Sequence, residues 1–445
     1  MANVVGAAAA AGSQELAKAG LESCHSEDIL WARGVLRYLQ GLTQGLPAAG
    51  LALFEASLAA TRSMSSTSRP TSDESANTDA EVACRHCFVG TLRMHHGRFQ
   101  EAEESFREAI AAYPQDRLPH LELCLLLEGQ RRFEEARLVA RKAIEAGAMW
   151  QHPYQRPPVF AQKLRSKAFW EKADFPWMKT LEDAFPQIKA ELEAVLPESN
   201  SDIMKVFRKV GEGGRAEQDA QIIALGGVWR ECVLFGCGGA GECTQVFPQT
   251  RALLEKLVPS AVEMARIGAG EIIVSALHPG TRLLPHCASS NTRLTCHLGL
   301  VCPEGPKIRV GEEWATWQEG QCMVFDDSFE HEVLYETPHV AGSTLRVVLL
   351  IRFWHPDLPE QRRIPTLEEG MVDFESVQGR RGAPPLSSAV SKCLEQHQRG
   401  LWNGLEEISV AGSAKIGGIA AESDSQRKSE HVDLERAIDE DNDLA

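Results

Sequence analysis

Two patterns of apolar residues divide the chain into a helical part and a β part. Apolar side chains at helical spacing predict helical structure over residues 28–58. The Ser/Thr-rich stretch near residues 60–80 has no apolar period and predicts a disordered insertion. Further helices are predicted over Leu181–Leu196, Thr250–Leu257 and Ser387–Leu401.

An internal repeat marks the helical part. Four residues recur with one offset of 34: Phe99, Ala102, Ala109 and Ile110 return as Phe133, Ala136, Ala143 and Ile144. Small residues at packing positions with this period are typical of tetratricopeptide repeats, which stack antiparallel helix pairs. The alternative is a plain pair of helical hairpins. Repeats of this type bind partners or support a neighbouring domain.

Short β-type runs separated by Gly and Pro turns follow from residue 271. The predicted strands are Glu271–Leu277, Thr292–Cys302, Lys307–Val310, Gln321–Phe325, His331–Tyr335 and Thr344–Phe353. Strands this short and closely spaced predict a β-sandwich or barrel. The fold class is therefore multidomain α + β, with helices first and strands later.

The net charge of −16 changes the picture of possible partners. An acidic chain repels phosphate backbones, so we expect no nucleic-acid partner. No run of about 18 apolar residues is present, so we expect no transmembrane anchor. The sequence does not fix a compartment; we favour the cytoplasm.

Candidate chemistry lies among the predicted strands. His286 follows a Pro-Gly turn and His331 starts a strand, and two imidazoles from separate strands can bind one transition metal. Ordinary surface or core histidines are the alternative. Arg346 lies in a strongly apolar strand, where a buried guanidinium needs a partner. That partner is either a protein carboxylate or a bound dicarboxylate.

Alternation along Thr292–Leu300 also indicates a ligand site among the strands. One face is polar and carries Arg293, Thr295 and His297. The opposite face is apolar and carries Leu294, Cys296, Leu298 and Leu300. A polar face inside an apolar protein requires water or a ligand.

Several ordered blocks resemble the aspartyl/asparaginyl β-hydroxylases. They are His278-Pro-Gly-Thr-Arg-Leu-Leu-Pro-His, Asn291-Thr-Arg-Leu-Thr-Cys-His-Leu-Gly-Leu, Phe325-Asp-Asp-Ser-Phe-Glu-His-Glu-Val, Leu345-Arg and Trp354-His-Pro-Asp-Leu, with Gln155-Arg-Pro-Pro and Phe169-Trp upstream. The resemblance implies a cupin-like double-stranded β-helix, a jelly roll, that uses Fe(II), 2-oxoglutarate and O₂. It implies hydroxylation of Asp or Asn in a protein, with release of succinate and CO₂. Animal members also carry tetratricopeptide repeats and are anchored in the endoplasmic reticulum.

The resemblance assigns roles residue by residue. His286 and His331 match the iron ligands, and Arg346 matches the arginine that binds the distal carboxylate of 2-oxoglutarate. Ser275 and His297 match residues that hold the cosubstrate. Arg293 matches a position associated with the acidic substrate side chain.

Three positions depart from the usual pattern of these relatives. Ala288 stands where the family usually has Gly and other oxygenases have a carboxylate ligand. Thr295 and Ile273 stand where members often carry Arg and some carry Lys, so both changes remove positive charge. We expect Asp326 and Asp327 to orient His331.

Other functions stay open at this point. A missing carboxylate also resembles the non-haem iron halogenases, in which halide takes the vacant position. Two further alternatives are a 2-oxoglutarate oxygenase that acts on a non-protein or other side-chain substrate, and a catalytically inactive tetratricopeptide scaffold.

The predicted organisation has four parts. Residues 1–27 form a flexible tail and 28–150 a tetratricopeptide-like region, on which a protein or peptide substrate docks. Residues 151–360 form the β-hydroxylase-like catalytic domain. Residues 361–445 form an extension that becomes an acidic, disordered tail from about 405.

Overall fold

A computed structural model describes residues 25–44, 50–65, 74–196, 206–210, 224–236, 242–336, 344–370 and 383–405. The chain divides into two compact units, Met1–Thr71 with Leu386–Ala445, and Ser72–Pro385. The predicted N-terminal tail up to residue 24 and the acidic tail from residue 406 lie outside the described residues.

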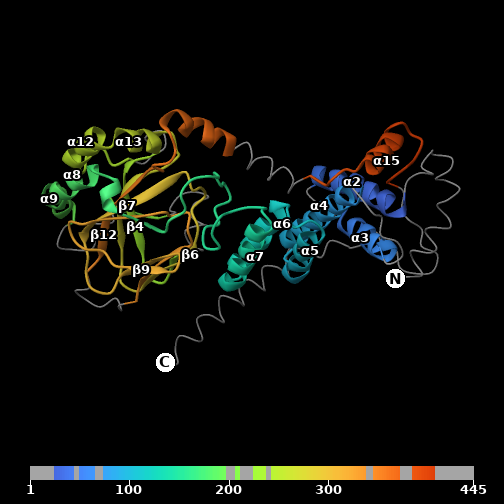
Figure 1. Cartoon of the computed structure of the whole chain (residues 1–445), viewed down its shortest axis with the longest axis horizontal. Coiled ribbons are helices and arrows are strands. Elements are labelled where there is room, and N and C mark those ends of the chain that lie inside the picture. The colour runs from blue at the N-terminus through green and yellow to red at the C-terminus, as the bar shows by residue number, and fades with distance from the viewer. Residues whose placement is uncertain are drawn as a thin grey trace, which may run out of the picture. The chain divides into compact units, whose positions relative to one another are not determined.

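The first unit combines helices from the two ends of the sequence (Figure 1). These helices are α2 (Ser26–Thr43), α3 (Leu51–Ser65) and α15 (Ser388–Gln398). Trp31 of α2 packs on Phe54 of α3 with ring centroids 4.6 Å apart. Arg37 of α2 donates a 2.6 Å hydrogen bond to the carbonyl of Leu405, just after α15.

The predicted helical character of residues 28–58 is confirmed in the described residues by two helices, and Pro47 lies in the sequence between them. The described part of the predicted 361–445 extension from Leu386 on belongs to the same unit as α2.

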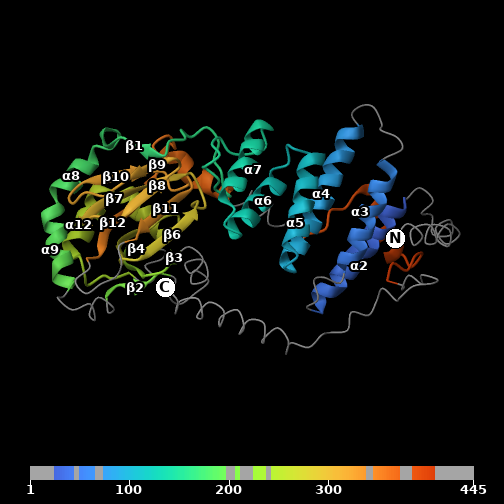
Figure 2. The ribbon, with the colours of Figure 1, turned by 90° about the horizontal axis from the view of Figure 1, so that it is seen from below.

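The second unit begins with four helices that lie side by side in sequence order (Figure 2). They are α4 (Glu74–His95), α5 (Phe99–Ala112), α6 (Arg117–Gly129) and α7 (Phe133–Glu145). The four repeat alanines are fully buried, so the 34-residue offset corresponds to equivalent packing positions on α5 and α7. The end of α3 and the start of α4 cover the two ends of the insertion predicted near 60–80. Its middle, residues 66–73, lies outside the described residues.

Two antiparallel sheets follow in this unit. The larger sheet has the order β1-β10-β7-β12-β5-β4-β2 and the smaller has β3-β6-β11-β8-β9. The first strands are β1 (Phe169–Trp170), β2 (Arg208–Lys209), β3 (Ala224–Leu225), β4 (Trp229–Phe235), β5 (Ile272–Leu277) and β6 (Thr281–His286). The later strands are β7 (Arg293–Val301), β8 (Lys307–Val310), β9 (Glu313–Ala315), β10 (Cys322–Phe325), β11 (His331–Tyr335) and β12 (Arg346–Trp354).

The six predicted strands are confirmed, and the α + β class with them. β4 and β6 were missed, as were the short strands β1, β2, β3 and β9. All but the first residue of β4 is buried, so its sequence shows no alternation, and β6 carries Pro285, which argues against a strand.

Helices cover the outer face of the larger sheet (Figure 1). They are α8 (Trp177–Asp183), α9 (Phe185–Val195), α12 (Pro248–Leu257) and α13 (Pro259–Arg266), with the short 3₁₀ helix η2 (Lys172–Asp174). The predicted helix over Leu181–Leu196 is two helices, because Pro186 begins a new one.

A second apolar core fills the space between the two sheets. Leu277, Phe325 and Val348 contribute to it from the larger sheet, and Val310 and Val333 from the smaller. The larger sheet therefore has an outer face against helices and an inner face against the smaller sheet.

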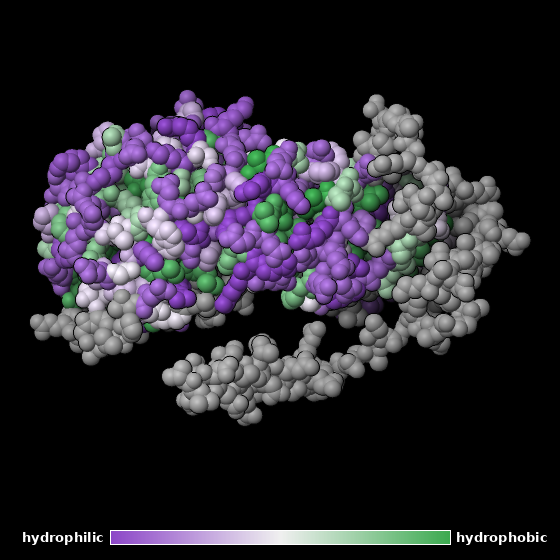
Figure 3. All heavy atoms as spheres, turned by 60° about the horizontal axis from the view of Figure 1, so that its bottom comes forward, coloured by the Kyte–Doolittle hydropathy of each residue, from purple (hydrophilic) through white to green (hydrophobic). Residues whose placement is uncertain are grey.

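Polar side chains cover most of the face drawn in Figure 3, where apolar residues form small separate groups. Among the described helices, none has both the length and the apolar character needed to cross a bilayer.

Candidate active site

His286 and His331 lie side by side on the smaller sheet. His286 is the last residue of β6, His331 is the first of β11, and the two are register partners. Their ring centroids are 4.2 Å apart. The predicted pair is therefore brought together by antiparallel pairing of two strands that are far apart in sequence.

Backbone carbonyls determine which ring nitrogen of each histidine is free to bind a metal. The Nδ1 atoms of His286 and His331 contact the carbonyls of Leu284 at 2.7 Å and Phe329 at 2.9 Å. A carbonyl only accepts hydrogen bonds, so each Nδ1 carries the proton and each neutral ring keeps a free lone pair on Nε2. This tautomer is the one that a metal ligand needs.

Burial keeps both rings neutral. It lowers the pKa of His286 to about 3, with a further contribution from His331. It also lowers the pKa of His331, against the opposing effect of Asp327. Two adjacent uncharged imidazoles can accept a divalent cation without first losing a proton.

The other predicted residues share the inner face of the larger sheet. Register places Arg346 opposite Leu277, Leu350 opposite His297 and Trp354 opposite Arg293. Ser275 lies two residues from Leu277, on the same face. The polar alternation along β7 therefore faces the smaller sheet, whereas its apolar side chains belong to the outer core.

Aromatic rings link the histidine pair to Arg346. Phe325 lies 6.1 Å from His331 and 4.9 Å from His297, measured between ring centroids. Trp317 donates from its indole nitrogen to Nδ1 of His297 at 3.1 Å, and the guanidinium of Arg346 lies 4.7 Å from the Trp317 ring. The sequence analysis assigned no role to Trp317, and Phe325 entered it only as a strand end and as the first residue of a resemblance block.

His297 presents a hydrogen-bond donor without a protein partner. Because its Nδ1 accepts from Trp317, the neutral ring carries its proton on Nε2. That Nε2 is buried and makes no hydrogen bond among the described residues. Burial, and next the charge of Arg346, hold the pKa of His297 well below its usual value.

Arg346 is a buried cation that no described carboxylate neutralises. It is 2% exposed, and its Nε and Nη1 atoms are buried without a hydrogen-bond partner. Burial lowers its pKa to about 10, so it stays charged at neutral pH. An unpaired buried guanidinium is costly unless a ligand provides the anion.

Arg352 shows the contrast on the same strand. It forms ion pairs with Glu271 at 3.0 Å and with Asp327 at 3.2 Å. Burial alone would lower its pKa, but these two carboxylates hold the pKa above its usual value. Arg352 lies directly opposite Thr295 in the register. It therefore supplies a positive charge next to the position where relatives often carry Arg and this chain has Thr295.

Arg293 has only part of its hydrogen-bonding capacity used by the described protein. It is half-buried, with one nitrogen donating to the carbonyl of Ala269 at 2.8 Å and a buried Nε that makes no hydrogen bond in the described structure. Its predicted contact with a substrate carboxylate therefore stays a prediction.

The expected orienting role of Asp326 and Asp327 is wrong for the His331 ring. The Phe329 carbonyl, which is adjacent in the turn, occupies Nδ1 instead. Asp326 accepts hydrogen bonds from Gln155 at 3.0 Å and from the Ser328 amide at 2.9 Å, and burial raises its pKa to about 8. Asp327 pairs with Arg352.

The remaining inner face carries one polar and one apolar feature. Ser275 is 3% exposed and accepts a 3.0 Å hydrogen bond from Trp229. Ile273 forms a separate buried apolar cluster with Val233 and Leu350, in the row that continues to His297.

Two packed antiparallel sheets with a histidine pair and an unpaired arginine define a class of metal- and anion-binding site. Among the described residues, no group of three or more His, Cys, Asp or Glu side chains could hold a metal. Among the described residues, no carboxylate thus joins the pair in a three-residue metal-binding group, and the residue two positions after His286 is Ala288.

Comparison with known proteins finds similarity to one family over part of the chain. Residues 182–356 match the model of the family described as Aspartyl/Asparaginyl beta-hydroxylase. The chain is 28% identical over 305 residues to the mouse protein named aspartyl/asparaginyl beta-hydroxylase, covering 62% of this chain and 39% of the relative. It is 31% identical over 198 residues to a Rhizobium tropici ornithine lipid ester-linked acyl 2-hydroxylase, covering 44% and 63%.

The human aspartyl/asparaginyl beta-hydroxylase matches in the same way, at 28% identity over 297 residues, 60% of this chain and 38% of the relative. The matched part thus spans about two fifths of the length of the mouse and human relatives. Over residues 182–356 the chain is thus similar to the aspartyl/asparaginyl β-hydroxylase family.

Proposed function

We propose that the chain is an Fe(II)- and 2-oxoglutarate-dependent dioxygenase that hydroxylates Asp or Asn side chains of a protein or peptide. The observation that carries the proposal is Arg346, a buried guanidinium without a carboxylate, linked through aromatic contacts to two metal-competent histidines. Iron with 2-oxoglutarate and O₂ supplies the oxidising chemistry, which releases succinate and CO₂ and places one oxygen atom in a C–H bond.

The two histidines hold the iron through their Nε2 atoms. Their Nδ1 protons stay on backbone carbonyls, which keeps the rings in one orientation. Ala288 leaves no side-chain ligand at the position where other oxygenases have a carboxylate. Its backbone amide donates to the carbonyl of Asp327 at 2.8 Å, which joins the turns after the two ligand strands.

Arg346 binds the distal carboxylate of 2-oxoglutarate. A dicarboxylate supplies the counter-charge that the described protein does not, and a guanidinium can hold it with two hydrogen bonds. His297 donates from Nε2 to an oxygen of the same ligand, and Trp317 holds that ring in the donating tautomer. Ser275 lies on the same sheet face and completes the predicted cosubstrate residues.

The architecture supports the finer expectations of the resemblance. Two facing antiparallel sheets agree with a double-stranded β-helix, and the buried alanines with tetratricopeptide-like packing. We propose that the substrate docks on the helical region and presents its acidic or amide side chain near Arg293.

One observation favours a second candidate substrate. The apolar cluster of Val233, Ile273 and Leu350 lies on the inner face, in the row that contains His297. An aliphatic chain fits such a surface better than a carboxylate does. The Rhizobium relative is named for hydroxylation of a lipid acyl chain.

The deciding experiment measures succinate release from 2-oxoglutarate with Fe(II), alone and with Asp- or Asn-containing peptides or acyl lipids. His286→Ala and His331→Ala should abolish release, whereas His397→Ala in α15 should not. Peptide-stimulated release and a peptide heavier by one oxygen support the proposal. Stimulation by acyl lipid alone would favour the second candidate, and chlorinated product in chloride buffer would favour a halogenase.

A further inference from the structure

A buried carboxylate next to the ligand His331 is held by arginines from three segments. Glu330 is fully buried. Its carboxylate lies 2.6 Å from Arg137, 2.6 Å from Arg156 and 2.8 Å from Arg309. Arg309 is on β8, but Arg137 is on α7 and Arg156 is in the segment after α7. Glu330 thus joins the helical region to the start of β11.

A second carboxylate extends this network into the helices. Glu128 of α6 contacts Arg156 at 2.7 Å, so Arg156 lies between Glu128 and Glu330. Arg137 stacks over the ring of Tyr154, 4.8 Å from its centroid. Burial and charge-assisted hydrogen bonds hold these side chains in fixed positions, whereas pairs of flexible side chains at the surface are held weakly.

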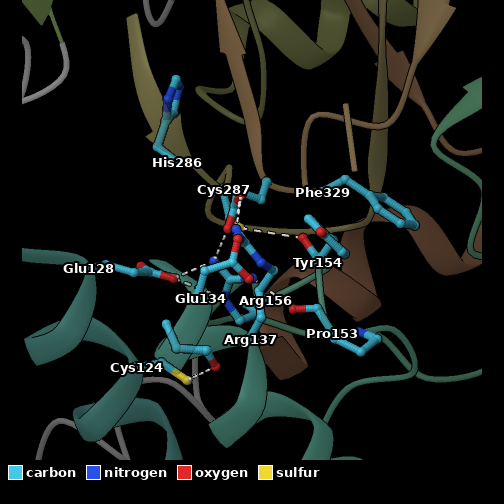
Figure 4. A network of polar contacts seen from close by, with 12 residues as sticks. Cys124, Glu128, Glu134, Arg137, Pro153, Tyr154, Arg156, His286, Cys287 and Phe329 are labelled. Atoms are coloured by element: carbon cyan, nitrogen blue, oxygen red, sulfur yellow. Dashed lines mark hydrogen bonds and ion pairs between the residues drawn. The ribbon is translucent and has the colours of Figure 1, made fainter. Parts of the chain in front are cut away.

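One backbone carbonyl contacts the neighbours of both histidines. The carbonyl of Tyr154 accepts from the Glu330 amide at 2.5 Å and from the Cys287 thiol at 3.8 Å. Figure 4 shows His286 pointing away from the network while Cys287, the next residue, points toward Tyr154. The residue after one ligand and the residue before the other therefore share an anchor.

The carbonyl that orients His331 is held by the same segment. Phe329, whose carbonyl contacts Nδ1 of His331, forms a β-bridge with Gln155. Its ring lies 5.1 Å from the ring of His152. Residues 152–156 therefore contact the two residues that immediately precede the ligand.

We propose that Glu330 is a positioning residue for the iron ligand His331, and that Arg137 and Arg156 make the helical region part of the metal site's support. Glu330 does not touch the metal; it holds the backbone from which His331 projects. The inference rests on the proposed function, since it presupposes that His331 binds a metal. Loss of an orienting group of this kind weakens metal binding by roughly 10-fold to 100-fold.

The test is Co²⁺ binding by the full-length chain, followed by calorimetry and by the visible spectrum of the bound ion. Glu330→Gln should weaken binding about tenfold or more and alter the spectrum. Arg137→Gln should also weaken binding, by about twofold to thirtyfold. Simple electrostatics predicts the opposite for Arg137→Gln, because removing a positive charge favours a bound cation.

Matched variants separate positioning from charge and from folding. Glu332→Gln removes a carboxylate on the other side of His331 that pairs with Arg309, and Arg141→Gln removes an exposed charge from α7. Both should leave Co²⁺ affinity within about twofold, no more than the smallest effect expected for Arg137→Gln. If Glu330→Gln does not fold, Arg137→Gln decides.

The outcomes are distinct. Weaker Co²⁺ binding by folded Arg137→Gln with unchanged controls supports the inference. Unchanged or tighter binding by folded Arg137→Gln overturns it, even if the wild-type chain binds Co²⁺ through its histidines. Failure of the wild-type chain to bind Co²⁺ overturns the proposed metal site, and the inference with it.

Discussion

Replacing Arg346 by Met should stabilise the ligand-free protein while weakening 2-oxoglutarate binding. Burial lowers the pKa of Arg346 to about 10, between two and three units below the ordinary value for arginine. That difference corresponds to about 3 kcal/mol against the charged form. Losing the contact with Trp317 offsets about 1–2 kcal/mol of this. The expected net gain in the free energy of unfolding is therefore about 1–2 kcal/mol.

The pH dependence has a definite sign. The folded state releases the Arg346 proton near pH 10, whereas the unfolded chain keeps it to a higher pH. The penalty is therefore present in full at neutral pH and is relieved only above about pH 10. Denaturant unfolding at neutral pH, without metal or 2-oxoglutarate, measures it directly.

Arg352→Met is the matched control on the same strand. Arg352 is paired with Glu271 and Asp327, so its loss leaves two carboxylates without their partner. We expect destabilisation by roughly 3 kcal/mol. Two arginines of β12 should thus give opposite signs under identical conditions.

Adding 2-oxoglutarate with Mn²⁺, in the absence of O₂, should stabilise wild type more than Arg346→Met. Ligand that binds only the folded state stabilises by about 2.7 kcal/mol at a hundred times its dissociation constant. Arg346→Met should lose about half of this or more, because a charge-assisted contact changes affinity by about tenfold to a hundredfold. The reasoning is refuted if Arg346→Met is less stable than wild type without ligand, or gains as much from 2-oxoglutarate.

Three further predictions follow from single contacts. Ala288→Asp adds a carboxylate two positions after His286, so Mn²⁺ binding measured by calorimetry should tighten while turnover falls; weaker binding would contradict this. Trp317→Phe removes the donor to His297, so the KM for 2-oxoglutarate should rise about tenfold with a smaller change in kcat; an unchanged KM would dismiss this role of Trp317. Ala109→Leu overfills a fully buried position on α5 and should lower stability by about 1–3 kcal/mol in thermal unfolding; an unchanged transition would contradict the packing.

Local pattern was sufficient for much of the β-domain. Alternation along β7 placed Thr295 and His297 on a face that the structure turns toward the smaller sheet. β4 escaped because a strand buried on both faces has no alternation to read. Local sequence also could not show that α15 packs with α2, since more than 300 residues separate them.

The candidate site was predictable in its residues but not in its connections. His286, His331 and Arg346 were identified from sequence, and the structure places the first two together. The pairing of Arg352 with Asp327 depends on how β12 meets the turn before β11. Spacing along the chain carries no information about such contacts, and the same holds for the arginines around Glu330.

The most direct test of the central claim is the fate of isotopically labelled dioxygen during turnover. The reaction contains 2-oxoglutarate, Fe(II) and a substrate that the chain hydroxylates. One labelled oxygen atom should enter succinate and one should enter the substrate, and both should disappear in His286→Ala and His331→Ala. A product that carries oxygen only from water, or labelled succinate formed equally by the histidine variants, would contradict the assignment of this pair as the oxygen-activating site.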